Sequence, residues 1–371
     1  MAFDPLKNLS PFVREVDNAL IIPFGTESAG GIARYAGIYD EHGTYVPEGQ
    51  CFRTSTTPTT LEPKEIPAEP EERLNGTWIW GGLLYSHFGH MLLESTGRLW
   101  AHDHVEAEGE LFLLKKKVTW PKRFVKPINP ILSHLGAKTA KAKGVTRPLR
   151  VEKLVIAPQG FGTGDMIAGC PEMRAFVKSN WGKGIEPAGH EKIYISRSRL
   201  YSKRGRYIGE SFLEALLEKE GYAIFHAQDH SIEEQIAQYK AAKVVISSDS
   251  SALHLHACFS AADTKVAIIL RRPGEAINDY LTQYRSFSGI APLVISSLNG
   301  AVYQFDGARN SQKSEIYTEI DFPSVARELY SANYIEYRSA WQNPPADEIK
   351  SEVASISERL GAPIYTVSDD I

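Results

Sequence analysis

Cysteine is scarce in this chain, and a long hydrophobic run is missing. Its 371 residues include three widely spaced cysteines, Cys51, Cys170 and Cys258, with no C-x-x-C pair, which argues against a disulfide framework or a zinc site. The first twenty residues lack a basic segment followed by an apolar one, and no apolar run reaches about 18 residues. These absences predict a cytoplasmic protein without a membrane span.

Acidic residues are absent from one long segment. Between Lys115 and Arg150 there are eleven Lys or Arg and no Asp or Glu. The rest of the chain therefore has 30 basic against 45 acidic residues, a formal net charge of −15, whereas the net charge of the whole chain is only −4. Such asymmetry favours a docking face for an anionic partner, and an acidic membrane surface at the inner face is the partner we expect. The alternative is a solvated surface. Nucleic acid is not expected, because only Trp120 and Phe124 interleave with the charges.

The stretch from Lys192 to Ala262 alternates strand and helix patterns. Three strands are expected at Ile193–Ser196, Tyr222–His226 and Val244–Ser248, with helices at Ser211–Lys219 and Ser231–Ala242. The second helix begins with a capping-box pattern, Ser231 followed by Glu234. Such alternation predicts βαβ units and a parallel sheet.

Polar residues stand where these strands end, and ligands of parallel sheets bind beyond the carboxyl ends of the strands. The first cluster contains Arg197, Arg199 and Lys203; the second contains Asp249, Ser250, Ser251 and Ala252 and opens onto a helix; Arg271 follows a further strand, Lys265–Leu270. A helix N-terminus and arginine forks both suit a phosphate. We therefore predict an anion site; the alternative is a solvated loop and a capped turn.

A second informative stretch is Thr77–Ala101. A strand there leads through Gly81-Gly82 into an expected helix, on which His87, His90, Glu94 and Arg98 follow at steps of three, four and four, so all four should share one face. Such a row suits general-base chemistry, with His87, His90 or Glu94 as the base. The alternatives are a buried polar network and, less strongly, a metal site, for which no remote ligand can be named.

The order of these residues resembles glycosyltransferase family 61, the family of bacterial capsular polysaccharide proteins and eukaryotic xylosyl- and N-acetylglucosaminyltransferases. Arg197, Glu234, Gln235 and Ala242 fit the pattern of its second half. Tyr85, His87 or His90, Glu94 and Arg98 match the block of its bacterial members; those residues lie in the Trp78–Ser95 region and just beyond it. Two places depart from the pattern: Asp249-Ser250 replaces a usual His-Gly, and Thr96-Gly97 replaces a usual Leu-Pro.

The resemblance implies an inverting, metal-independent glycosyltransferase without a cofactor, which moves a hexose or pentose from a nucleotide-sugar donor, UDP-linked, to a glycan or lipid-linked glycan in capsule or envelope synthesis. No D-x-D motif is present. Arg197, Arg199, Lys203, Glu234, Gln235 and the Asp249–Ala252 turn are the expected donor-binding residues, with Arg98 and Arg271 as further site residues.

The expected fold is α/β, with two Rossmann-like lobes facing a cleft, the GT-B type. Residues 1–170 would form the acceptor-side lobe and 171–330 the nucleotide-sugar lobe, and helices in 331–371 would cross back to the first lobe. Near the C-terminus the sequence predicts a hairpin edge at Val302–Phe305 and helices at Phe322–Ser331, Tyr334–Trp341 and Asp347–Leu360. Two other functions remain open. A polysaccharide pyruvyltransferase would use phosphoenolpyruvate, and a non-catalytic scaffold would result if Asp249 repels the donor diphosphate.

Overall fold

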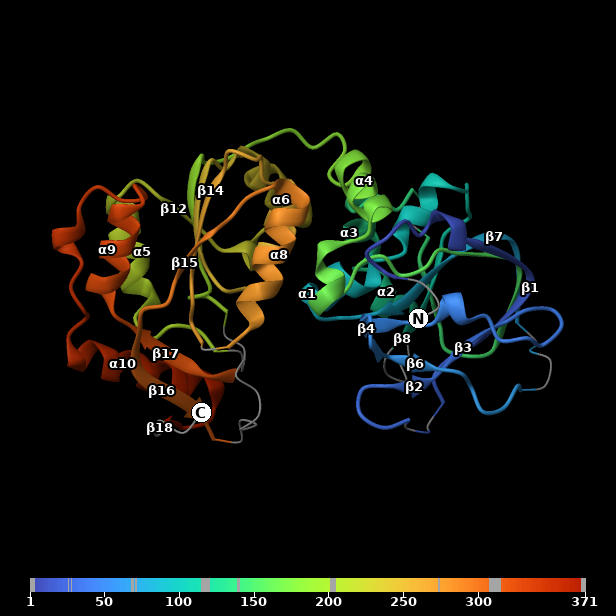
Figure 1. Ribbon diagram of the computed structural model, residues 1–371. Coiled ribbons are helices and arrows are strands. Elements are labelled where there is room, and N and C mark those ends of the chain that lie inside the picture. The colour runs from blue at the N-terminus through green and yellow to red at the C-terminus, as the bar shows by residue number, and fades with distance from the viewer. Residues whose placement is uncertain are drawn as a thin grey trace. The chain divides into compact units, whose positions relative to one another are not determined.

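The computed structural model describes residues 4–25, 27, 29–67, 70, 72–114, 121–138, 141–200, 205–272, 274–306 and 315–367. The chain divides into two compact units, Met1–Ile185 and Glu186–Ile371 (Figure 1). Each unit has its own sheet and is described by itself. Both are mixed α/β, which confirms the predicted fold class at that level.

The first unit is organised around a six-stranded sheet in the order β3-β1-β10-β7-β8-β9. Its strands are β1 Arg14–Ile22, β3 Gly37–Tyr39, β7 Arg73–Leu84, β8 Glu110–Leu114, β9 Lys143–Val145 and β10 Leu149–Ile156. The four strands from β10 to β9 run parallel, whereas β1 pairs with both of its neighbours in an antiparallel way. The sheet is therefore mixed.

Short elements surround this sheet. They are the strands β2 Arg34–Tyr35, β4 Phe52–Thr54, β5 Thr57–Pro58 and β6 Thr60–Leu61, and the helices α1 Phe88–His90, α2 Pro121–Val125, α3 Asn129–His134 and α4 Pro171–Asn180. The side chains of Trp80, Trp100 and Phe112 are almost fully buried and fill the core. The central strand β7 ends at Leu84, and the chain then turns into α1.

The second unit contains a five-stranded parallel sheet in the order β12-β11-β13-β14-β15. The strands are β11 Lys192–Ile195, β12 Ala223–Phe225, β13 Val244–Ser248, β14 Lys265–Ile269 and β15 Leu293–Ile295. In this doubly wound order, the chain direction across the sheet reverses between β11 and β13. Ligands of such sheets bind at the carboxyl ends of those two strands.

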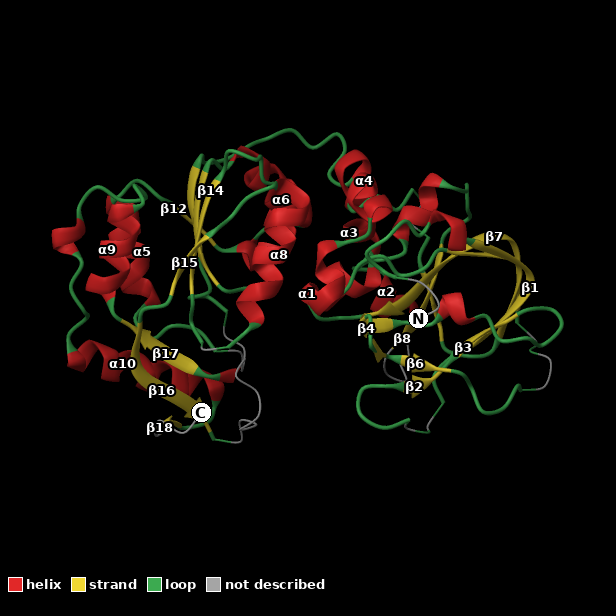
Figure 2. Cartoon of the chain, in the orientation of Figure 1, coloured by secondary structure: helices red, strands yellow, loops and turns green. Residues whose placement is uncertain are grey.

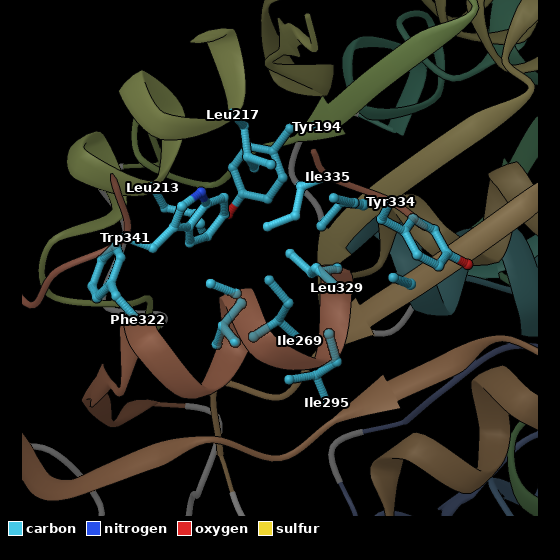
Figure 3. Close-up of a cluster of buried hydrophobic side chains, with 14 of the residues drawn as sticks. Tyr194, Leu213, Leu217, Ile269, Ile295, Phe322, Leu329, Tyr334, Ile335 and Trp341 are labelled. Atoms are coloured by element: carbon cyan, nitrogen blue, oxygen red, sulfur yellow. The ribbon is translucent and has the colours of Figure 1, made fainter. Parts of the chain in front are cut away.

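Helices cover both faces of this sheet: α6 and α8 lie on one side, and α5 and α9 on the other (Figure 1). The helices of this unit are α5 Glu210–Lys219, α6 Ile232–Ala241, α7 Ala252–Phe259, α8 Ala276–Ser288, α9 Phe322–Ser331 and α10 Ala346–Leu360. A buried core fills the side of α5 and α9, where Tyr194, Leu213, Leu217, Phe322 and Leu329 meet (Figure 3). The Ser231–Glu234 capping box of α6 is present as predicted.

The C-terminal part forms a small three-stranded sheet beside α10 (Figure 2). Its strands are β16 Leu298–Phe305, β17 Tyr317–Ile320 and β18 Ile364–Val367, in the order β17-β16-β18. Sequence patterning places a hairpin edge at Val302–Phe305, but β16 is the middle strand, because β18 arrives from a distant part of the chain to pair with it.

A helix expected over Tyr334–Trp341 is wrong. Asn333 takes a positive φ of 57° after α9, and only Arg338–Ala340 forms a short helical turn. Tyr334 and Trp341 both pack into the core of the second unit as part of this irregular segment. The predicted crossing of residues 331–371 to the first lobe stays a prediction, as do the predicted domain limits.

Candidate functional site

The carboxyl ends of β11 and β14 bring two buried arginines into one region of the second unit. Arg197 follows β11 and is 7% exposed, and Arg271 follows β14 and is 3% exposed. The backbone N–H of Arg197 donates to Glu210 Oε1 at 2.8 Å, and its Nη2 donates to Gly205 O at 3.2 Å. These contacts hold Arg197 at the topological switch point of the sheet.

Asp249, which follows β13, is held between two arginines. Its Oδ1 accepts a hydrogen bond from the Arg271 backbone N–H at 3.0 Å and lies 3.5 Å from Arg271 Nε. Its Oδ2 accepts from Arg272 Nε at 2.8 Å. The carboxylate is thus paired with positive charge, and its side chain is 3% exposed. This pairing counters the repulsion that an isolated Asp249 would exert on a phosphate.

Several buried donors in this region have no partner within the described part of the chain. They are Arg197 Nε, Arg271 Nη1, Ser248 Oγ and Ser250 Oγ. Buried polar groups are nearly always paired, and an unpaired one costs about 1–3 kcal/mol. Four such donors beside the start of α7, whose first backbone N–H groups add positive potential, form an arrangement that an anion with several oxygens would satisfy.

Repulsion between the guanidinium groups reinforces this character. Burial lowers the pKa of Arg271 to about 10; the Asp249 charge opposes the shift, and the charges of Arg197 and Arg272 add to it. Burial also raises the pKa of Glu210, although the bond from the Arg197 backbone works against that. The region therefore carries positive charge in excess of what its carboxylates neutralise, and a bound anion would relieve the repulsion.

The other predicted donor-binding residues lie elsewhere or have local partners. The side chain of Arg199 is 61% exposed and pairs with Asp229 at 3.3 Å, so it does not join the buried arginines. Glu234 caps α6, accepting from the Ser231 backbone at 2.7 Å. Gln235 Nε2 donates to Ala227 O at 2.8 Å. A donor-binding role for Glu234 and Gln235 stays a prediction.

The remaining members of the predicted donor-binding set are Ser250, Ser251, Ala252 and Lys203. Ser250 and its neighbour Ser251 form the turn into α7, and Ala252 is the first residue of the helix. The hydroxyl of Ser250 is one of the four donors without a partner among the described residues. Lys203 lies outside the described residues.

In the first unit, a polar cluster follows the carboxyl end of β7. Glu94 lies in a π-helical turn, Met91–Ser95, directly after α1; such turns occur frequently at functional sites. His90 Nδ1 lies 2.6 Å from Glu94 Oε1, and Arg53 Nε lies 3.4 Å from the same carboxylate. The Glu94 side chain is 2% exposed, whereas His90 is 33% exposed.

This arrangement fixes how His90 can act. Because a carboxylate offers only acceptor atoms, Glu94 accepts the hydrogen bond and His90 Nδ1 donates it. The other ring nitrogen, Nε2, then carries the lone pair on a half-exposed ring. An imidazole held by a carboxylate in this tautomer can accept a proton from a hydroxyl.

Tyr85 completes the cluster at the end of β7. Its ring lies 5.4 Å from the His90 ring, and Arg53 lies over it at 5.7 Å. Arg53 Nη2 also lies 3.5 Å from the Tyr85 hydroxyl. Burial, followed by the nearby Glu94 charge, raises the pKa of Tyr85 well above its ordinary value, so this hydroxyl stays protonated at neutral pH.

The prediction that His87, His90, Glu94 and Arg98 share one helix face is wrong. The α-helical part covers only α1, and the π-helical turn changes the spacing after it. His87 precedes α1 with an extended backbone, although its ring lies 5.2 Å from that of His90. His90 and Glu94 do meet as the spacing predicts.

Arg98 points into the protein instead. It is 1% exposed, and its guanidinium donates to the backbone carbonyls of Glu48, Gln50 and Ala157. Its contacts join the Glu48–Gln50 turn to the end of β10. The adjacent Gly97 is needed because an added Cβ would lie 2.6 Å from Phe161 O. Arg98 therefore stabilises the framework behind the cluster.

Sequence patterning missed Arg53 and Arg272 as members of these sites. Arg53 lies on β4, 41 residues before Glu94, in a region without a readable motif. Arg272 had a weak signal, because it follows Arg271 at a basic strand end. Only the tertiary contacts identify their partners.

Among the described residues, no group of three or more His, Cys, Asp or Glu side chains is placed to hold a metal ion. Over the same residues, no helix combines the length and the apolar character that crossing a bilayer requires.

Comparison with known proteins gives one family. The Glycosyltransferase 61 family model matches residues 88–267, a segment that contains α1 and Glu94 and runs through β11, β13 and most of β14. No curated protein matches the chain. The matched segment holds His90, Glu94, Arg197 and Asp249, the residues around which both clusters are built. Residues 88–267 thus match the glycosyltransferase 61 family, and this match supports a family 61 glycosyltransferase.

Proposed function

We propose that this glycosyltransferase takes its sugar from a nucleotide-diphosphate donor, UDP-linked, and binds the diphosphate with Arg197, Arg271, Ser248 and Ser250. The observation that carries the proposal is the group of buried donor atoms without partners among the described residues, at the carboxyl ends of β11, β13 and β14. A diphosphate offers several oxygens to guanidinium and hydroxyl donors and suits a helix N-terminus. Phosphoenolpyruvate, the substrate of the alternative pyruvyltransferase, offers only one phosphate.

The chemical step is a single displacement. The acceptor hydroxyl oxygen forms a bond to the anomeric carbon while the bond from that carbon to the phosphate oxygen breaks. The acceptor proton goes to His90 Nε2, and Glu94 stabilises the resulting imidazolium. The electron pair of the broken bond leaves on the diphosphate, whose charge the arginines neutralise. One displacement inverts the anomeric centre.

The remaining parts of the proposal follow from the family resemblance and the charge pattern. The transferred sugar is a hexose or pentose, and the acceptor is a glycan or lipid-linked glycan of a capsule or envelope polysaccharide. The two units adopt the GT-B arrangement, and transfer is metal-independent, because arginine charge takes the place of a cation at the leaving phosphate. The protein acts in the cytoplasm, peripheral at the inner membrane face.

Calorimetric titration with nucleoside diphosphates tests this function. We expect UDP to bind with an affinity that EDTA leaves unchanged, and phosphoenolpyruvate to produce no heat of binding. Arg197→Gln should weaken UDP binding at least tenfold, since it removes a charged hydrogen-bond donor.

Arg199→Gln is the matched control, because it removes the same charge two residues further along the same loop, from an arginine that is exposed rather than buried. If Arg197→Gln, folded as judged by circular dichroism, bound UDP as the wild type does, the diphosphate site would be wrong. Binding of phosphoenolpyruvate instead of any nucleotide would favour the pyruvyltransferase. Binding of neither would favour a scaffold.

A further inference from the structure

A pocket of about 1240 Å³ lies in the first unit, apart from the His90 cluster. Its lining comes from α2, the edge strand β9, and the first halves of β7 and β8. The His90 cluster follows the opposite end of β7. The pocket is larger than the roughly 300–1,000 Å³ of most small-ligand sites. Nothing in the proposed transfer step uses it.

The floor of this pocket is apolar. Leu74 and Trp78 of β7, Leu111 of β8, Val145 of the edge strand β9 and Leu149 of β10 line it. All but Leu74 are at most 5% exposed, whereas Leu74 is half-buried. A hydrocarbon chain would remove the exposed apolar surface of Leu74 from water, whereas such a floor offers little to a purely polar anion.

The rim of the pocket is strongly basic. Its exposed cations are Lys122, Arg123, Lys126, Lys141, Lys143 and Arg147, against two carboxylates, Glu72 and Glu108. Lys141 pairs with Glu108 at 3.4 Å, and Lys143 lies 4.4 Å above the Trp78 ring. Lys122, Arg123, Lys126 and Arg147 make no ion pair with any described residue. Uncompensated positive charge therefore surrounds an apolar interior.

We propose that this pocket binds an anionic membrane lipid, with one hydrocarbon chain on the apolar floor and the phosphate on the basic rim. The combination of the two surfaces points to this occupant, since each of them suits one half of an amphiphile. The site would dock the enzyme on an anionic membrane and hold it there by an inserted chain. The inference rests on the membrane partner in the proposed function and adds a specific binding site for the lipid.

Vesicle flotation tests the rim. We expect the protein to float with vesicles of phosphatidylcholine and phosphatidylglycerol, and to remain behind with phosphatidylcholine alone. Lys122→Gln combined with Lys126→Gln should weaken this binding about tenfold or more. Lys178→Gln combined with Lys183→Gln removes the same charge from exposed positions of the first unit outside the pocket and should leave binding within about twofold.

Calorimetry with dodecyl phosphate, below its critical micelle concentration, tests the binding of the hydrocarbon chain. Inorganic phosphate is the probe that lacks such a chain. Leu74→Trp enlarges a side chain of the pocket lining and should weaken dodecyl phosphate binding about fivefold or more, while elution from a cation-exchange column stays unchanged. Thr146→Trp fills the same lining from an exposed position and serves if Leu74→Trp does not fold.

The outcomes separate the two levels of the proposal. Unchanged dodecyl phosphate binding in a folded pocket-filling variant would overturn the proposed lipid-binding site. Loss of flotation in the rim variant would still support membrane docking. Wild-type flotation of the rim variant would overturn the docking as well. Equal binding of inorganic phosphate and dodecyl phosphate would show an anion site without a place for the chain.

Discussion

The two clusters use charge in opposite ways. In the second unit, Asp249 is paired with Arg271 and Arg272, and donor atoms of Arg197 and Arg271 are still left over. In the first unit, one carboxylate, Glu94, serves both a guanidinium and the His90 imidazole. An excess of fixed donors suits binding of a stable anion, whereas a shared carboxylate suits an imidazole that gains and loses a proton.

Both clusters nevertheless follow the carboxyl ends of parallel strands, β7 in the first unit and β11, β13 and β14 in the second. The sheet edge supplies rigid positions, and the side chains after it decide the chemistry. Substitutions at one cluster should therefore alter turnover, and those at the other should alter donor affinity. Two predictions test that separation, and two more concern stability away from the clusters.

The largest expected effect is at His90. His90→Gln removes the proton acceptor and should lower turnover by about 10²–10⁴-fold, or roughly 3–5 kcal/mol of activation free energy, while UDP affinity stays within about twofold. Steady-state rates and calorimetry measure the two. Glu94→Gln should lower turnover less, because the imidazole remains. Wild-type turnover of a folded His90→Gln would remove His90 from the mechanism.

A smaller effect is expected at Arg271. Arg271→Lys keeps the charge but loses the planar fork, so UDP affinity should fall about tenfold, while turnover at saturating donor changes less. Arg272→Lys is the matched comparison: Arg272 also pairs with Asp249, yet it has no buried atom left without a partner. Equal losses in both variants would mean that Asp249 pairing, rather than the free donor on Arg271, governs binding.

The next prediction concerns stability, at a buried imidazole outside both clusters. Burial lowers the pKa of His256 to about 3, and the ring contacts the Tyr284 hydroxyl at 2.6 Å. Between pH 6.5 and 3 the imidazole binds a proton in the unfolded chain but not in the folded one. The free energy of unfolding therefore falls with decreasing pH by up to about 1.4 kcal/mol per pH unit. Urea unfolding of His256→Gln should show a flatter pH dependence; an identical slope would contradict the assignment.

The smallest effect is expected at the α6 cap. Ser231→Ala removes the hydroxyl that accepts the Glu234 backbone N–H and should lower the free energy of unfolding by about 1 kcal/mol. Glu234→Ala should act similarly, with UDP affinity unchanged in both. A loss of UDP affinity in Glu234→Ala alone would instead support the donor-binding role that the family resemblance implies for Glu234.

The two units also differ in how well their sequence predicts them. The strands β11, β13 and β14 and the helices α6 and α9 lie where apolar periodicity and turn residues place them. Each is a local pattern of about five to twelve residues. The predicted helix from His87 to Arg98 was wrong, because backbone bonding changes to a π-helical turn after three residues, and side-chain periodicity does not report that change.

For this protein, the sequence by itself determined the parallel sheet of the second unit, the polar strand ends, the His90–Glu94 spacing and the basic segment. These follow from periodicity and composition, which act over short distances along the chain. Only the tertiary structure decided that Arg53 joins Glu94 and that Arg271 and Arg272 neutralise Asp249. Such pairs depend on strand order and burial, because groups far apart in sequence meet only when the sheet has formed.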